Sequence, residues 1–170
     1  YRAPVDVSDL DDPDAKRLAP LQWTGALEAR TAFADGFPLL VTSTASLDEL
    51  NRRLAANGHE AVTMQRFRPN IVLDGVADAH GEDFIDTLTL ESADGPVVIK
   101  LVKPCGRCTI PYLEPTTSEQ GHAVADALSA YRAEPSIGGA LAFGQNAVVV
   151  SGIGNRLRVG AEVQAELCFD

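Results

Sequence analysis

The sequence has few cysteines, few cations and no long hydrophobic run. Three cysteines, two of them close together, indicate reduced cytosolic thiols rather than a disulfide-stabilised secreted domain, so we expect a cytoplasmic protein. Lys and Arg number 14 against 24 Asp and Glu, and the formal charge of −10 argues against nucleic acid as the main partner. Without a membrane-spanning apolar stretch or a signal pattern, we expect no membrane partner either.

The length of 170 residues fits one domain with a full core, and 45% hydrophobic with 22% charged residues is ordinary for a globular protein. Residues 1–36 show no sustained periodicity, and five aspartates crowd the first fourteen positions. This acidic run lacks the Gly and terminal Glu of a calcium loop, which favours a solvated lead-in. Because the chain begins at Tyr1 rather than Met, we expect a piece of a longer protein.

Short apolar runs predict a domain built mainly from strands. An Asp-Gly turn at Asp94-Gly95 predicts a hairpin between strands 85–90 and 97–102. Further strands are expected at 38–42, 71–74, 147–150, 156–159 and 163–169. A helix is expected at 46–57, opened by a capping box of Ser46 and Glu49, and a second at 122–132. The pattern predicts a mainly β domain with peripheral helices (α+β), forming a mixed, mostly antiparallel, barrel-like sheet.

The most informative segment is Lys103-Pro104-Cys105-Gly106-Arg107-Cys108, directly after an apolar strand. Such a thiol pair can bind a metal, form a redox disulfide, supply one reactive thiolate or simply pack in the core. Cys168, far away in the sequence, is the only other cysteine. One chain therefore has three thiols and cannot form a four-thiolate zinc site. The neighbouring cations stabilise thiolate over thiol and can hold an anion. The segment therefore indicates a soft-metal or anionic-cofactor site.

Arg68 and Asn70 form a second candidate group, within Arg66-Phe67-Arg68-Pro69-Asn70. Pro69 predicts an extended backbone at Arg68, which would then project from a strand entrance. A guanidinium presents a fork of donors suited to phosphate, and the Asn70 amide can donate or accept. The plainer interpretation is that these are solvated charges at a strand end.

Taken together, these segments resemble the C-terminal MOSC domain of molybdenum-cofactor proteins, in the amidoxime-reducing branch with its bacterial relatives. The resemblance covers about four fifths of the chain, in order and spacing. It is carried by 33–40, 46–51, 66–72, Gly81-Glu82-Asp83, 103–108, Tyr131-Arg132, Phe143-Gly144-Gln145-Asn146 and Val159-Gly160. It implies a connecting segment at 1–32, a MOSC-type barrel at 33–170, and a further N-terminal β-rich domain in family members.

The resemblance also implies roles for individual residues. Cys108 aligns with the thiolate that binds molybdenum and takes part in catalysis, whereas Cys105 aligns with a thiol that is not the main ligand. Arg68 and Asn70 align with residues that contact the pterin and phosphate of the molybdenum cofactor (molybdopterin with Mo), and Arg107 lies beside the ligand.

The segment Asp35-Gly36-Phe37 resembles the loop that lines the same cofactor, so Asp35 and Phe37 are further candidates for binding it. Two departures from the family's pattern stand out. Ile85 replaces a common tryptophan, and the loop at 113–121 is longer, with Glu114 where Asp is usual.

The activity implied by the resemblance is reduction of N-hydroxylated compounds such as hydroxylamines, amidoximes and N-hydroxy bases. Electrons would come from a separate reductase, an iron–sulfur or flavin protein. The alternative is a sulfur-carrier or cofactor-delivery module, since MOSC domains also occur fused to pyridoxal-phosphate-dependent cofactor sulfurases. This chain has no large aminotransferase-like segment, which favours the reductase.

Overall fold

A computed structural model describes residues 17–31 and 36–168. The strands are β1 (Arg17–Leu18), β2 (Arg30–Thr31), β3 (Leu39–Ser43), β4 (Ile71–Leu73), β5 (Ile85–Leu90), β6 (Val97–Gly106), β7 (Ala133–Glu134), β8 (Ala140–Ser151) and β9 (Val163–Leu167). The helices are α1 (Leu21–Thr24), α2 (Thr44–Ala56) and α3 (Ala123–Ser129). Four 3₁₀ turns are described: η2 (Met64–Phe67), η3 (Gly81–Phe84), η4 (Ile110–Tyr112) and η5 (Pro135–Ile137).

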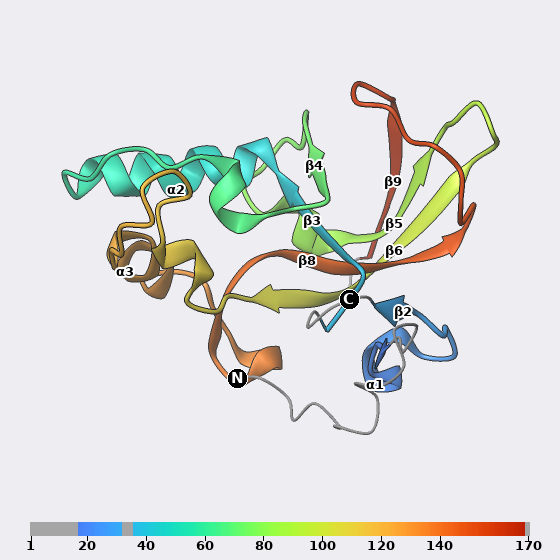
Figure 1. The fold of residues 1–170 in the computed structure, drawn as a ribbon, viewed down its shortest axis with the longest axis horizontal. Helices are drawn as coiled ribbons and strands as arrows, with labels where there is room; N and C mark the ends of the chain where they lie inside the picture. Colours follow the sequence, from blue (N-terminus) through green and yellow to red (C-terminus); the bar gives the residue numbers. More distant parts are fainter. Residues whose placement is uncertain (1–16, 32–35, 169–170) are drawn as a thin grey trace.

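The main sheet has seven strands in the order β4-β3-β8-β6-β5-β9, with β7 added on β8. Within the described residues β3–β4 is the only parallel pair, and every other pair is antiparallel. The sheet curls into a half-barrel, with α2 and α3 packed together beside it and α1 on another side (Figure 1). The predicted fold class, a mixed and mostly antiparallel β domain with peripheral helices, is confirmed.

The predicted hairpin is present, because β5 and β6 pair antiparallel from Thr87↔Lys100 to Leu90↔Val97. Ser92 Oγ donates to the Gly95 carbonyl over 2.6 Å and closes the turn, where Gly95 has φ +108°. The inward-facing side chains of this hairpin join those of the neighbouring strands in one apolar core. This packing fixes the position of β6, whose far end carries both Cys105 and Gly106.

Helix α2 begins two residues before the predicted start, and the predicted cap is wrong. Ser43 is the N-cap, and its Oγ accepts a hydrogen bond from the Ser46 amide at 3.1 Å. Ser46 lies inside the helix, where its hydroxyl donates to the fully buried Glu82 carboxylate. Ser43 Oγ donates to the same carboxylate at 2.7 Å, so both serines are tied to a distant segment, which the local Ser-x-x-Glu spacing does not indicate.

The C-terminal prediction was partly wrong. The expected strand at 147–150 is one part of the longer β8, and the expected strand at 163–169 appears as the shorter β9, which ends at Leu167, while residue 169 lies outside the described residues. No strand forms at 156–159, where Val159 is fully exposed and Gly152, Gly154 and Gly160 all have positive φ. The alternating Arg-Leu-Arg-Val residues have the pattern of a strand, but no described strand pairs with this segment. Helix α3 ends at Ser129 rather than 132.

Gly144 allows β8 to cross close to β3. It has φ +76°, and a Cβ atom at this position would approach the Val41 carbonyl oxygen to 2.5 Å. The pairing of β8 with β6 shifts register here, between Pro104↔Gln145 and Gly106↔Ala142, and again between Leu101 and Lys103. Such bulges bend strands and redirect side chains. The first thiol, Cys105, lies within the shift between Pro104 and Gly106.

No helix in residues 17–31 or 36–168 is long and apolar enough to cross a bilayer.

Candidate functional site

A cleft of about 590 Å³ opens at the end of β6 that carries the thiols. It collects most of the residues singled out in the sequence: Phe37, Arg68, Asn70, Arg107 and Cys108 all line it. Further lining residues are Lys103, Cys105, Gly106, Ile110, Ile137 and Ala140. Asp35 lies outside the described residues. Segments far apart in sequence thus meet at one concave surface, which suits ligand binding.

The two thiols of the pair differ in environment. Cys108 is exposed, whereas Cys105 is half-buried and accepts a hydrogen bond from Arg107 Nη1 over 3.1 Å. Burial raises the pKa of the Cys105 thiol, and the charge and hydrogen bond of Arg107 oppose that rise. Cys108 is therefore the more accessible of the two thiols that line the cleft, while Cys105 is held by its hydrogen bond to Arg107.

Arg107 joins the thiol segment to the rest of the site. Its Nη2 donates to the Phe67 carbonyl over 3.0 Å, and its amide donates to the Leu141 carbonyl over 2.8 Å. The Nε atom is buried and has no hydrogen-bond partner among the described residues. Since buried polar atoms are rarely left unsatisfied, this donor is available to a ligand or a water.

Arg68 is exposed, lines the cleft and has an unusual backbone. With φ 55° and ψ 48° it lies in the left-handed region, so the extended backbone predicted from Pro69 is wrong. Its amide donates to the Gln65 carbonyl and ends the turn η2, which overrides the preference of a residue before proline. A residue other than glycine pays roughly 1–3 kcal/mol for this conformation, and such outliers concentrate at functional sites.

Asn70 binds the backbone of β3 at two points. Its side-chain oxygen Oδ1 accepts a hydrogen bond from the backbone amide of Leu40 at 2.8 Å. The backbone amide of Asn70 donates to the Leu40 carbonyl at 2.9 Å. These bonds fix the oxygen of the side-chain amide toward the protein. The nitrogen of the same amide is the group left to face a ligand.

Lys103 is the third cation of the cleft. Its Nζ lies 5.0 Å from the ring centre of Trp23 and 5.8 Å from that of Phe37. The buried Phe37 packs in a small core with Val148, Ala19 and Ala29. These aromatic contacts hold the Lys103 ammonium at the cleft without neutralising its charge.

Arg66 belongs to the same segment as Arg68, but it does not line the cleft. It forms an ion pair with Glu114 and donates to the Pro111 carbonyl over 3.1 Å. Arg66 therefore anchors the loop that follows the thiols. That loop carries Ile110, which forms part of the cleft wall.

The charge of the cleft is unbalanced. Arg68, Lys103 and Arg107 form no ion pair with a described carboxylate, whereas Arg52, Arg53, Arg66, Lys100 and Arg132 all do. Three cations with no carboxylate partner among the described residues, beside an exposed thiol, favour an anionic ligand. Across residues 17–31 and 36–168, no three His, Cys, Asp or Glu side chains are grouped so that they could hold a metal ion.

Sequence reasoning missed the polar network behind the site. Asp83 pairs with Arg132 Nη2 at 2.7 Å and accepts from Gln145 Nε2 at 2.7 Å. Arg132 Nε also donates to the Ala142 carbonyl over 3.1 Å. These contacts tie η3 and the segment after α3 to the bulged part of β8. The motifs Gly-Glu-Asp, Tyr-Arg and Gly-Gln-Asn carried the signal, but local spacing gives no hint that they meet.

The domain is a mainly β half-barrel with an exposed thiol and three cations at one cleft. Comparison with known proteins identifies its family. The MOSC domain model matches residues 28–164. The chain therefore belongs to the MOSC domain family.

Among curated proteins it is similar to human mitochondrial amidoxime-reducing component 1, with 40% identity over 86 residues. Human mitochondrial amidoxime reducing component 2 is 39% identical over 88 residues. These matches cover 51% and 52% of this chain, but only 23% and 24% of the relatives, so the matched segment is about a quarter of their length. Among solved structures, YiiM from Geobacillus stearothermophilus aligns with a TM-score of 0.46 and 11% identity, over 82% of this chain and 63% of that one.

Proposed function

We propose that this chain is the molybdenum-cofactor-binding domain of an oxidoreductase that reduces N-hydroxylated compounds. The observation that carries the proposal is the meeting of the exposed Cys108 thiol with Arg68, Lys103 and Arg107 in one cleft. The similarity to amidoxime-reducing components supports the choice of reaction. We further propose that the protein acts in the cytoplasm, with no nucleic-acid or membrane partner.

The residues present fit such a cofactor. A thiolate is a suitable ligand for a metal that already carries soft sulfur donors, and one protein ligand suffices when the other ligands come with the cofactor. The buried Nε of Arg107, which has no hydrogen-bond partner among the described residues, and the cleft's cations, which have no carboxylate partner among them, suit an anionic phosphate. The cleft volume of about 590 Å³ lies within the usual range for ligand sites.

Each residue has a proposed role. Cys108 would bind the metal, and Arg68 would bind the phosphate or pterin with its guanidinium fork. Asn70 would donate from its side-chain nitrogen, since its oxygen is bound to Leu40. Arg107 would hold Cys105 and offer its free donor, and Phe37 would form the apolar floor beside Lys103. Asp35 stays a candidate from the resemblance alone.

When bound, the cofactor supplies the two-electron redox chemistry of the reduction. For a hydroxylamine, two electrons and two protons break the N–O bond and give an amine and water. The electrons would come from a separate reductase carrying a flavin or an iron–sulfur centre. The protein supplies the thiolate, the anion contacts and a pocket wall at Ile110 and Ile137.

The test is cofactor loading combined with turnover. The chain would be produced with added molybdate, its molybdenum and pterin content measured, and hydroxylamine or benzamidoxime reduction followed with a chemical electron donor. We expect Cys108→Ser to lose molybdenum and activity. Cys168→Ser is the matched control, because it removes another exposed thiol outside the cleft. Equal losses in both variants would contradict the assignment, and cofactor binding without turnover would favour the delivery module.

A further inference from the structure

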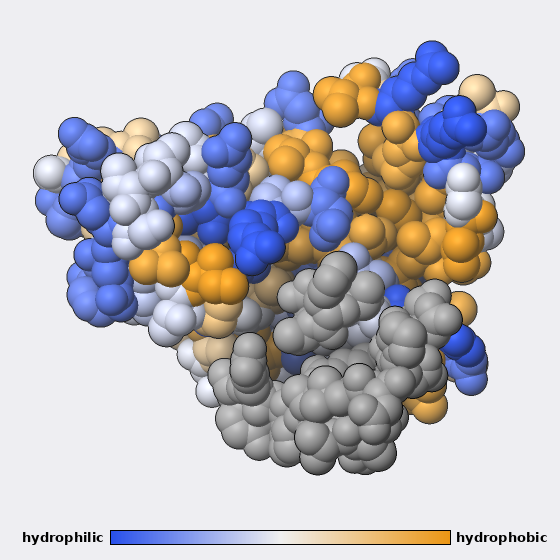
Figure 2. All heavy atoms as spheres, viewed as in Figure 1, coloured by the Kyte–Doolittle hydropathy of each residue, from blue (hydrophilic) through white to orange (hydrophobic). Residues whose placement is uncertain are grey.

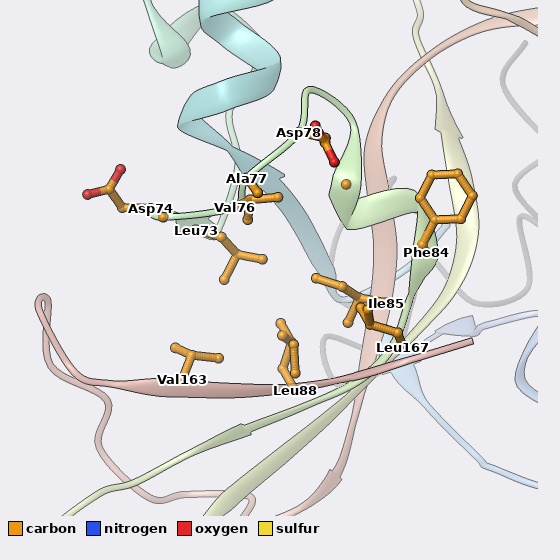
Figure 3. A pocket seen from close by; sticks show the side chains of 13 residues that line it. Leu73, Asp74, Val76, Ala77, Asp78, Phe84, Ile85, Leu88, Val163 and Leu167 are labelled. Carbon is orange, nitrogen blue, oxygen red and sulfur yellow. The ribbon is translucent and has the colours of Figure 1, made fainter. Parts of the chain in front are cut away.

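A second cavity, of about 420 Å³, lies at the open side of the half-barrel. Its walls are the segment from Leu73 to Asp78 on one side and β5 with β9 on the other, and apolar side chains face one another across it (Figure 3). None of its lining residues lines the thiol cleft. It is therefore a separate feature of the molecule.

This cavity opens directly into the main core. Leu73, Ile85 and Leu88 are buried members of the core, yet they also line the cavity. At its rim Phe84 is 59% exposed and Leu167 50% exposed. Apolar side chains gather around this opening on the surface as well (Figure 2). A continuous exposed apolar area of this kind marks an interaction site.

The cavity is bordered by an open sheet edge. Strand β9 ends the strand order and pairs only with β5 among the described residues. Its residues alternate, so that Val163, Ala165 and Leu167 line the cavity while Gln164 and Glu166 do not. An edge strand presents unpaired backbone donors and acceptors to any chain that lies alongside it. Both the backbone and the side chains of β9 are thus arranged for another strand.

The charged residues at the cavity indicate which kind of strand would bind there. Among the described residues, Asp74 and Asp78 are the only charged ones that line the cavity, and neither forms an ion pair with a described cation. Asp74 Oδ1 accepts a hydrogen bond from Thr44 Oγ1 at 2.8 Å, and its other oxygen has no partner among the described residues. The rim is therefore acidic above an apolar floor, the opposite of the cationic thiol cleft.

We propose that the β9 edge binds an extended peptide segment as an additional strand. Alternate apolar side chains of that segment would enter the cavity toward Leu73 and Leu88, and a Lys or Arg would lie at Asp74 and Asp78. Backbone pairing supplies affinity in this mode of recognition, and pockets for alternate side chains supply selectivity. A small apolar ligand would fill the cavity but leave the strand edge unused.

The probe is a capped peptide of about seven residues in which valine alternates with lysine, long enough to span β9. Three comparison ligands are used: the same peptide with alternate backbone nitrogens methylated, a valine–glutamate version, and octylammonium. Binding is measured by calorimetry, and pairing by amide hydrogen exchange in 163–167. The protein variants are Asp74→Asn with Asp78→Asn, and a control pair of equal charge change, Asp48→Asn with Glu60→Gln, outside the cavity.

We expect the valine–lysine peptide to bind and to slow amide exchange in β9. The Asp74/Asp78 double variant should bind it about tenfold more weakly, as expected for loss of two exposed charge contacts, and the control pair should bind it unchanged. The methylated and glutamate peptides should bind poorly. Absence of peptide binding, equal binding of the methylated peptide, or binding of octylammonium alone would overturn the proposal. Concentration-dependent dimerisation with protection of β9 would instead assign the edge to a second copy.

Discussion

The guanidinium of Arg107 donates a hydrogen bond to the Cys105 sulfur over 3.1 Å, and this contact separates the two thiols chemically. Cys105 is half-buried and its pKa is raised by burial, while Cys108 is exposed in the same cleft. A thiol reacts as its thiolate, so both accessibility and acidity set its reactivity. The two positions of the Cys-x-x-Cys segment are therefore unequal before any ligand binds.

Alkylation should reveal this inequality. In a Cys168→Ser background, we expect iodoacetamide to modify Cys108 at least about tenfold faster than Cys105 at neutral pH. The rate at Cys105 should rise only at a pH above the ordinary thiol range, because burial raises its pKa. Peptide mass spectrometry over time measures both rates. Similar rates, or a stable disulfide between the two residues, would contradict the structural difference.

Substitutions at Arg68 should separate stability from cofactor binding. Arg68→Gly relieves the left-handed backbone, so the free energy of unfolding should stay level or rise by up to about 1 kcal/mol. Arg68→Ala keeps the strain and should change stability by less than about 0.5 kcal/mol. Both should lower cofactor content, and Arg68→Lys should restore it only in part, because a point charge cannot replace the fork. Urea unfolding and pterin analysis provide the two measurements.

Arg158→Ala is the matched control for this series, because it removes an exposed arginine that does not line the cleft. It should leave cofactor content unchanged. A loss of cofactor equal to that of Arg68→Ala would mean that net charge, rather than the position of Arg68, governs binding.

The ion pair between Arg66 and Glu114 should control the loop that follows the thiols. Glu114→Ala leaves the nearly buried Arg66 without its carboxylate and should lower the free energy of unfolding by about 1 kcal/mol. Amide exchange in 109–121 should become faster, which mass spectrometry can follow. Glu119→Ala removes a carboxylate from the same loop without affecting Arg66 and should have little effect. If both variants behave alike, the loop is not anchored by this pair.

His80 should make stability depend on pH. It is buried against Tyr131 and Phe143, and burial together with the charge of Arg132 lowers its pKa to about 4 from 6.5, although Asp83 opposes the shift. Between these values the unfolded chain binds a proton that the folded protein does not. Stability should therefore fall as pH drops from 6.5 toward 4, by about 3 kcal/mol from this residue.

Chemical unfolding at several pH values tests this dependence. His80→Asn should flatten the slope between pH 6.5 and 4, since asparagine does not titrate and tolerates the left-handed backbone at this position. His59→Asn, at an exposed histidine, should keep the slope of the parent protein. An unchanged slope in His80→Asn would show that other groups cause the acid sensitivity.

Local sequence signals predicted those elements whose cause is local. The Asp94-Gly95 turn predicted the β5–β6 hairpin, and the helix expected at 46–57 is present as α2. They failed where a distant contact decides the conformation. The helix cap is Ser43 rather than Ser46, in a segment whose serines both donate to the distant, buried Glu82 carboxylate. Arg68 has a left-handed conformation at the end of η2, which a residue before proline normally avoids.

The candidate site shows the same division. The thiol pair and its cations were visible in sequence, yet nothing local placed Arg68 on the same cleft as Cys108, and only the family resemblance linked them. The network of Asp83, Arg132 and Gln145 was unpredictable from spacing, because Asp83 and Gln145 are 62 residues apart. It is a product of the curled sheet rather than of any single segment.

The two walls of the thiol cleft come from different kinds of structure. One wall, with Cys105 and Gly106, belongs to the long strand β6, whose register is fixed by its neighbours. The other wall, with Ile110 and Ile137, belongs to the short turns η4 and η5. Mutations in the turns can therefore reshape their wall of the cleft without altering the pairing of β6, whereas mutations in the strand alter the position of Cys105. Over evolutionary time, or in a directed-evolution experiment, the range of ligands that the cleft accepts can therefore change while the sheet beneath it is kept.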